Sequence, residues 1–327
     1  MSMRRKILSL LLLTAFAPLV AEAQSPAKIP RLCFMTFDPG TLQSNRYATF
    51  FQRLSDLGYI DQKTINIDYL TADGHGERFP ALAAECLRLH ADIIVVSTTP
   101  AAQAAKKATS TIPIVLFSLG DPVGTGLVDS LAHPGANITG FTYMAPGIAA
   151  KRLDLLKQTM PKISRVLVLT YLTDPIAASQ VKEMKKAASS MGVTLLIHDI
   201  RSPDYLERAF EAGARARAEG LLITAESIFV VNQARVVELA AKYRLPASYP
   251  NPSFVEIGGL MSYSQNINVS RTRVAMYVDK ILKGAKPADM PIEQPTTFEL
   301  HVNLKTAKEL RLAIPESILF RADRVIE

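Results

Sequence analysis

Hydroxyl and carboxylate side chains follow two predicted strands in the first half of the chain. Thr98 and Thr99 come one residue after a β-branched run that ends at Val96, and Ser118 and Asp121 follow the next apolar run. A helix is predicted to begin beside Thr98 and Thr99, so that free backbone N–H groups lie next to these hydroxyls. The combination suits a carboxylate or another anion, although the same side chains are ordinary helix caps. For the set as a whole, we expect a binding site.

The second half has polar and aromatic residues at similar places. Glu226 follows a predicted strand, where its carboxylate would pair with a cationic group of a ligand; the alternative is an exposed acid that caps a helix. Tyr171 and Tyr249 each follow a predicted strand, and Tyr143 lies near a segment that connects the two halves. Such side chains would form a flat apolar slot with hydroxyls at its rim, unless each packs under a loop.

Motifs for catalysis, metal binding and nucleotide binding are weak or missing from the sequence. The five histidines lack metal-ligand spacing, and no G-x-S-x-G, P-loop, H-E-x-x-H or C-x-x-C pattern occurs. Gly124 and Gly126 resemble the start of a dinucleotide fingerprint, but Asp129 occupies the third glycine position. A turn followed by a helix over 123–131 explains these glycines better. We therefore expect a binding protein without enzymatic activity, cofactor or metal.

Residues 1–23 have the features of a cleavable export signal. Basic residues at 4–6 precede an apolar run over 7–20, and the residues at 21–23 fit the small-x-small cleavage pattern. The run is short for a membrane span, which needs about 20 apolar residues, so we favour a cleaved signal over an uncleaved anchor. We expect the mature chain to begin at residue 24 and to be a periplasmic protein without stable membrane insertion.

Composition supports a globular binding protein with two domains. The 327 residues are 48% hydrophobic and 20% charged, which excludes a disordered chain. Removal of the signal lowers the net charge from +7 to +5, and the scattered basic residues indicate no nucleic-acid partner. Cys33 and Cys86 exclude a disulfide scaffold. An oxidising compartment permits a bridge between them, but we favour two buried thiols, because a strand and its covering helix seldom bring Cβ atoms close enough.

Predicted strands and helices alternate along most of the chain. This pattern predicts an α/β fold with two doubly wound, Rossmann-like lobes, each a parallel sheet with helices on both faces. Ligands of such sheets bind beyond the carboxyl ends of the strands, so we expect a site in a cleft between the lobes. The principal strands are predicted over 31–37, 64–70, 92–96, 113–118, 137–141, 165–170, 193–199, 220–224, 246–248, 259–262 and 297–302.

Longer motifs carry a resemblance to a known family over essentially the whole mature chain. The motifs lie at 108–115, 120–128, 131–140, 277–289, 293–296 and 303–308. They resemble the ABC-transporter substrate-binding proteins related to tryptophan- and tyrosine-binding members. The resemblance implies the type 1 periplasmic-binding fold, with a hinge around Tyr143, Gln265 and Thr296. It also implies capture of a small molecule and its delivery to an ABC permease with its ATPase.

The resemblance also implies roles for individual residues. Hydroxyls after the third and fourth strands, here Thr98, Thr99 and Ser118, would hold a ligand carboxylate. An acid in the second lobe, here Glu226, would hold an ammonium group, although the family usually has Asp at this position. Asp38, in the first loop, is a second departure, which would add negative charge near the cleft.

The chain division and the function follow from this resemblance as expectations. We expect 24–142 plus about 266–296 in the first lobe, and 143–265 plus about 297–327 in the second. The expected function is that of a monomeric periplasmic component of an ABC importer. Its ligand would be a small carboxylate-bearing molecule, with aromatic and other amino acids among the candidates. The alternative is a ligand-sensing protein of the same fold that feeds a signalling partner.

Overall fold

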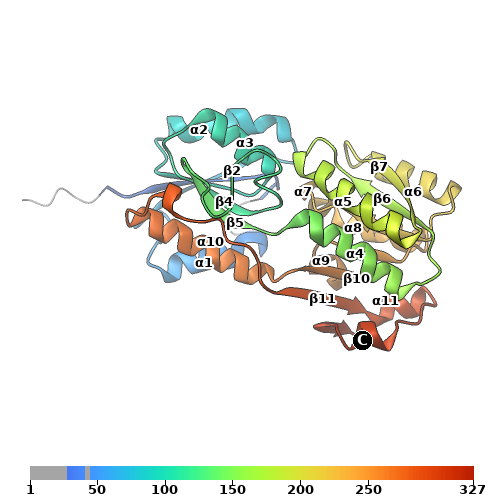
Figure 1. Cartoon of the computed structure of the whole chain (residues 1–327). Helices are drawn as coiled ribbons and strands as arrows, with labels where there is room; N and C mark the ends of the chain where they lie inside the picture. Colours follow the sequence, from blue (N-terminus) through green and yellow to red (C-terminus); the bar gives the residue numbers. More distant parts are fainter. Residues whose placement is uncertain (1–27, 41–44) are drawn as a thin grey trace, which may run out of the picture.

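A computed structural model describes residues 28–40 and 45–327 of the chain. The expected export signal lies outside these residues. Two sheets with flanking helices form two lobes, which lie side by side in Figure 1. No helix within the described ranges is long and apolar enough to cross a membrane.

The first lobe is built on a five-stranded sheet in the order β2-β1-β3-β4-β5, in which all strands are parallel. Its central strand β3 has the sequence IIVV, and all four side chains are buried, as expected for a parallel strand covered on both faces. The strands are β1 (Arg31–Thr36), β2 (Asn66–Thr71), β3 (Ile93–Val96), β4 (Ile114–Leu119) and β5 (Ile138–Thr142).

Side-chain alternation along these strands divides the first lobe into two cores. On one face, Ile94 and Val96 pack with α2 (Phe79–Arg88) and α3 (Thr99–Ala108). On the other face, Ile93 and Val95 pack with α1 (Ala48–Asp56) and α10 (Ile267–Leu282). The helix α10 therefore returns to the first lobe after the chain has built most of the second.

The second lobe has a seven-stranded sheet in the order β12-β11-β10-β9-β8-β6-β7. Only β10 and β11 pair antiparallel; the other pairs are parallel. The strands are β6 (Arg165–Thr170), β7 (Thr194–Asp199), β8 (Gly220–Ile223), β9 (Ala247–Tyr249), β10 (Met261–Gln265), β11 (Phe298–Asn303) and β12 (Arg324–Ile326).

Helices cover both faces of the second sheet as well. Side chains of α4 (Ala145–Thr159) and α5 (Pro175–Met191) pack with Val166 and Val168 on one face. Side chains of α6 (Tyr205–Arg215) and α8 (Gln233–Lys242) pack with Leu167 and Leu169 on the other. The remaining helices are short: α7 (Ser227–Val231), α9 (Pro252–Glu256), α11 (Leu304–Glu309) and α12 (Glu316–Leu319).

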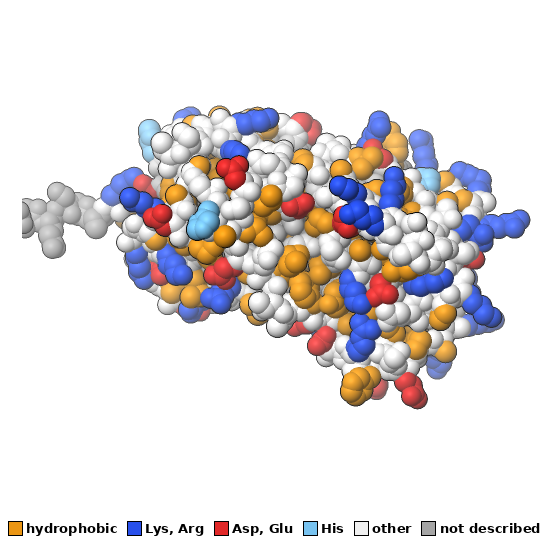
Figure 2. All heavy atoms as spheres, in the orientation of Figure 1, with side chains coloured by type: hydrophobic (Ala, Val, Ile, Leu, Met, Phe, Trp, Pro, Cys, Tyr) orange, Lys and Arg blue, Asp and Glu red, His pale blue; other side chains and the backbone are white. Residues whose placement is uncertain are grey.

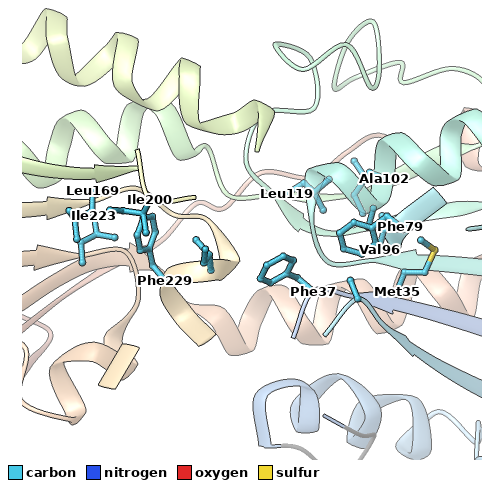
Figure 3. Packing of buried hydrophobic residues seen from close by; sticks show 14 of the residues in the cluster. Met35, Phe37, Phe79, Val96, Ala102, Leu119, Leu169, Ile200, Ile223 and Phe229 are labelled. Carbon is cyan, nitrogen blue, oxygen red and sulfur yellow. The ribbon is translucent and has the colours of Figure 1, made fainter. Parts of the chain in front are cut away.

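One buried apolar cluster includes side chains from both lobes. Phe37, after β1, lies between first-lobe residues such as Phe79 and second-lobe residues such as Phe229 (Figure 3). Three described segments connect the sheets: β5 to α4, β10 to α10, and the stretch before β11. The lobes are therefore in contact as well as linked by the chain.

The helix predicted over 123–131 is wrong, because the structure has consecutive turns there. The Asp121 carboxylate accepts the N–H of Gly124 at 2.8 Å, and the Thr125 hydroxyl donates to the Asp121 carbonyl at 2.6 Å. Gly126 has a φ of +70°, which a right-handed helix does not allow. Local hydrogen bonds of this kind compete with helix formation.

Both cysteines are buried free thiols in the structure. Cys33 lies in β1 and Cys86 in α2. A hydrogen bond between the two thiols, together with burial, raises the pKa of Cys86. The site described next does not involve them.

Candidate functional site

A cavity of about 150 Å³ lies between the two lobes, at the carboxyl ends of their strands. This is where an open α/β sheet binds its ligands, and the volume is enough for a molecule about the size of a benzene ring. Its walls come from both lobes and from the connecting segments. The lining residues used below are Arg46, Tyr47, Thr98, Thr99, Phe117, Tyr143, Ile148, Arg152, Asp174, Ile176, Ala225, Ser227 and Arg271.

Thr98 and Thr99 line the first-lobe wall, where the sequence placed them. Thr98 is the N-cap of α3, and its hydroxyl accepts the N–H of Ala101 at 3.3 Å. Both residues are buried. Capping and ligand binding are therefore compatible here, because the same helix terminus faces the cavity.

The other two expected residues of the first lobe are not placed in the cavity. Asp121 is absent from the lining, because its carboxylate closes the turn to Gly124. Ser118 belongs to β4, but its side chain lies outside the described part of the structure.

Arg152 is the most unusual residue of the cavity, and the sequence analysis missed it. It lies on α4, is only 2% exposed and lines the cavity. Within the described part of the chain, its Nε and Nη1 have no hydrogen-bond partner. Burial lowers the pKa of the guanidinium to about 10, against the opposing effects of Tyr143 and Glu226. Its spacing of four residues from Ile148, which also lines the cavity, is the sequence signal that could have identified it.

Two buried acids lie in the second lobe, and only Asp174 lines the cavity. Asp174 caps α5 by accepting the N–H of Ile176 at 3.1 Å, and burial raises its pKa to about 6. Glu226 is 1% exposed, although its neighbours Ala225 and Ser227 line the cavity. The acid that lines the cavity is thus Asp174, whereas Glu226 lies behind the wall.

Glu226 is held by the side chains of Gln180 on α5 and of Thr224, two residues before it in the same loop. Gln180 donates from Nε2 to Glu226 Oε1 at 2.8 Å, and its own Oε1 accepts the N–H of Ala225 at 3.1 Å. Thr224 is hydrogen-bonded to the second carboxyl oxygen. Burial, and then the charge of Asp174, raise the pKa of Glu226 to about 8. Glu226 therefore fixes the loop after β8.

Tyr171 and Tyr249, which were expected to form an aromatic slot, do not line the cavity. Tyr249 is 1% exposed and stacks on Phe254, with 4.9 Å between the ring centroids. Tyr171 packs against the apolar cluster that joins the lobes, and neither residue lines the cavity. Both rings are packing residues, because the ends of β6 and β9 direct them into apolar surroundings.

Tyr143 is the expected aromatic residue that does line the cavity. It lies on the connection between β5 and α4, and its hydroxyl donates to the carbonyl of Ala225 at 3.4 Å. Burial raises the pKa of its phenol, so the hydroxyl stays a neutral donor. This hydrogen bond ties a connecting segment to the loop that Glu226 fixes.

At the first-lobe wall, an ion pair neutralises Asp38. Asp38 is 6% exposed, pairs with Arg46 and accepts the hydroxyl of Tyr47 at 2.7 Å. The negative charge expected near the cleft from the sequence is therefore compensated. Arg46, a member of this pair, lines the cavity, and so does Arg271. The sequence did not identify either arginine as a site residue.

Comparison with known proteins identifies the family. A profile of the family described as ABC transporter substrate binding protein matches residues 42–326. The chain belongs to this family. It is a binding protein rather than an enzyme, and the fold and family expected from its sequence motifs are confirmed.

Relatives of this substrate-binding protein include amino-acid binders. A tyrosine-binding protein of Clostridioides difficile is 25% identical over 262 residues, which cover 80% of this chain and 75% of that protein. A Streptococcus pneumoniae ABC domain in complex with L-Trp has a TM-score of 0.83 and 26% identity, covering 91% of this chain and 99% of that one. A conserved domain protein of Vibrio cholerae has a TM-score of 0.85 and 25% identity, covering 91% and 100%.

No group of three or more His, Cys, Asp or Glu that could hold a metal occurs within residues 28–40 and 45–327. Lys and Arg are spread over both lobes on the face in Figure 2, with Asp and Glu among them. The functional chemistry that the described residues offer is therefore that of the cavity between the lobes.

Proposed function

We propose that this substrate-binding protein works outside the cytoplasm as the solute-capturing component of an ABC importer. We also propose that its ligand is a small molecule with a carboxylate. The observation that carries the ligand chemistry is the buried guanidinium of Arg152, a residue of the cavity wall whose Nε and Nη1 have no hydrogen-bond partner among the described residues. A buried charge without a partner is costly, and a carboxylate can accept two parallel N–H bonds from arginine.

A ligand held in this way would join the two lobes. Arg152 belongs to the second lobe, whereas Thr98, Thr99 and the N-terminus of α3 belong to the first. A molecule that contacts both walls binds the closed arrangement better than an open one, so it shifts the protein towards closure. A permease with its ATPase would then recognise the closed, loaded monomer.

Amino acids are a first class of ligand to test. The relatives described above include a tyrosine-binding protein and a domain in complex with L-Trp. We propose that Asp174, which lines the cavity, would pair with the ammonium group, rather than Glu226, which does not line it. Arg152 would hold the carboxylate on the same side of the cavity.

The test is a thermal-stability screen of the purified protein against L-amino acids, aromatic acids and short carboxylates. A ligand at about 100 times its Kd stabilises by about 2.7 kcal/mol, which raises the melting temperature measurably. We expect Arg152→Gln to weaken binding by about 10- to 100-fold or more, as for loss of a charged hydrogen bond. Lys151→Gln is the matched control, since Lys151 pairs with Asp154 and does not line the cavity. Binding by no carboxylate at all would contradict the proposal.

A further inference from the structure

A second cationic group without an anion lies at the first-lobe wall of the cavity. Arg46 and Arg271 both line this wall, and Asp38 pairs with Arg46 alone. Within the described residues, Arg271 forms no ion pair and its Nε has no hydrogen-bond partner; Nη1 reaches only Asn268 Oδ1, at 3.5 Å. Asp38 therefore compensates the charge of Arg46, and the charge of Arg271 has no ionic partner among the described residues.

The electrostatic surroundings of Arg271 favour the binding of an anion beside it. Burial and the like charge of Arg46 lower its pKa to about 10, and Tyr47 opposes them. Two cations beside one partly buried cavity repel each other, and the repulsion is relieved when an anion binds between or beside them. Tyr47 cannot supply it, because its hydroxyl is already bonded to Asp38 and its pKa is raised by burial.

Arg271 and Arg152 belong to opposite walls of the same cavity. Arg271 lies on α10, which packs on the first sheet, and its electrostatic neighbours are Arg46 and Tyr47. Arg152 lies on α4, which packs on the second sheet, and its neighbours are Tyr143 and Glu226. The cavity thus has two guanidinium groups with nitrogen atoms that lack a hydrogen-bond partner among the described residues, one contributed by each lobe.

We propose that the ligand is a small acid with two anionic groups, one bound by Arg152 of the second lobe and the other by Arg271 of the first. This inference rests on the proposed function, because it takes the cavity as the ligand site. A neutral amino acid or a monocarboxylate would leave one guanidinium unpaired. Apolar side chains of Phe117, Ile148 and Ile176 also line the cavity and suit the carbon body of such a molecule.

The experiment compares acids that differ only in the second anionic group. Titration calorimetry on the purified protein would pair glutarate with pentanoate, adipate with hexanoate, and terephthalate with benzoate. A fourth pair, L-glutamate with L-glutamine, tests whether the ligand also has an ammonium group. We expect the dianion of at least one pair to bind about 10- to 100-fold more tightly than its partner, the range of a charge-assisted hydrogen bond.

Variants of α10 assign this difference to Arg271. Arg271→Gln is expected to remove the preference for the dianion while leaving the affinity for the matched monoanion within about threefold. Arg271→Lys is expected to keep part of the preference for the dianion that Arg271→Gln loses, because lysine keeps the positive charge. Arg273→Gln is the matched control, since Arg273 lies on the same helix, pairs with Glu293 at 3.4 Å and does not line the cavity.

The outcomes separate this inference from the proposed function. If monoanions bind as tightly as dianions, or if Arg271→Gln weakens both equally or neither, the second anion site is wrong while carboxylate capture stands. If none of the acids, nor any amino acid, binds the wild-type protein, the proposed function fails and the inference fails with it. A preserved melting temperature of Arg271→Gln shows that lost affinity is not lost folding.

Discussion

Glu226 and Asp174 are two buried carboxyl groups, Asp174 in the wall of the cavity and Glu226 behind it, and the charge of Asp174 contributes to the raised pKa of Glu226. Burial and this charge favour the protonated form of Glu226, and the hydrogen bonds around the carboxyl group can accommodate it. Thr224 Oγ1 lies 3.1 Å from the Leu169 carbonyl as well as next to a Glu226 oxygen. A hydroxyl has one proton, so when Thr224 donates to Leu169, Glu226 is the donor to Thr224.

This arrangement predicts that Glu226→Gln stabilises the protein at neutral pH. An amide can accept from Gln180 and donate to Thr224 without a charge to desolvate. The pKa of Glu226 is raised from 4.5 to about 8. Between these pH values the carboxyl group is ionised in the unfolded chain but protonated in the folded protein, so the free energy of unfolding falls as pH rises. We expect Glu226→Gln to flatten this fall and to gain on the order of 1–3 kcal/mol near pH 8. Denaturation at several pH values measures it; an unchanged pH profile would exclude a protonated Glu226.

Arg152→Met is expected to stabilise the empty protein and to abolish binding of a carboxylate. The guanidinium of Arg152 is buried with two nitrogen atoms unpartnered among the described residues, and an apolar side chain of similar length removes that desolvation cost. Replacing buried charges by apolar groups stabilises other proteins by about 1–4 kcal/mol. Urea denaturation of the ligand-free protein measures the gain in stability, and titration calorimetry measures the loss of carboxylate binding. A destabilised Arg152→Met would indicate that Arg152 is already satisfied in the empty protein.

The fold could be predicted from the sequence where single strands are strongly patterned. Runs such as Ile93–Val96 in β3 are continuously apolar because both faces of a parallel sheet are covered. The helix expected over 123–131 failed for a local reason: the Asp121 carboxylate and the glycines favour turns. Hydrophobic spacing cannot report such competition, since Leu127 and Val128 are buried although no helix forms.

The site was only partly accessible to sequence reasoning. Thr98 and Thr99 could be found because they follow a strand and begin a helix, a position defined by local sequence. Arg152 and Arg271 lie inside helices, and only the packing of the two lobes decides that they face a shared cavity. The contact of Glu226 with Gln180 joins residues 46 positions apart, and no pattern in the sequence marks that pair.

Tyr249 provides a test of the packing role that the structure gives it. Its ring is buried against Phe254, so Tyr249→Ala should destabilise the second lobe by about 3–5 kcal/mol, as for other large aromatic truncations in cores. Tyr249→Phe keeps the ring and should cost much less. Thermal denaturation measures both, and ligand affinity of the Tyr249→Phe variant should equal that of the wild type. If Tyr249→Phe weakens ligand binding while its stability is normal, the Tyr249 hydroxyl contacts the ligand and the packing role alone is wrong.

Thr98 and Asp121 form a matched pair that separates capping from ligand binding. Each side chain accepts a backbone N–H three residues ahead, from Ala101 and from Gly124 respectively. Thr98→Ala and Asp121→Ala should therefore each cost about 1 kcal/mol of stability, as for loss of a cap.

Of these two residues, only Thr98 lines the cavity, so only Thr98→Ala should also weaken carboxylate binding, by about five- to tenfold for one hydrogen bond. Thr98→Ser keeps the hydroxyl and should preserve both properties. Equal affinities of Thr98→Ala, Asp121→Ala and the wild type would mean that Thr98 only caps α3.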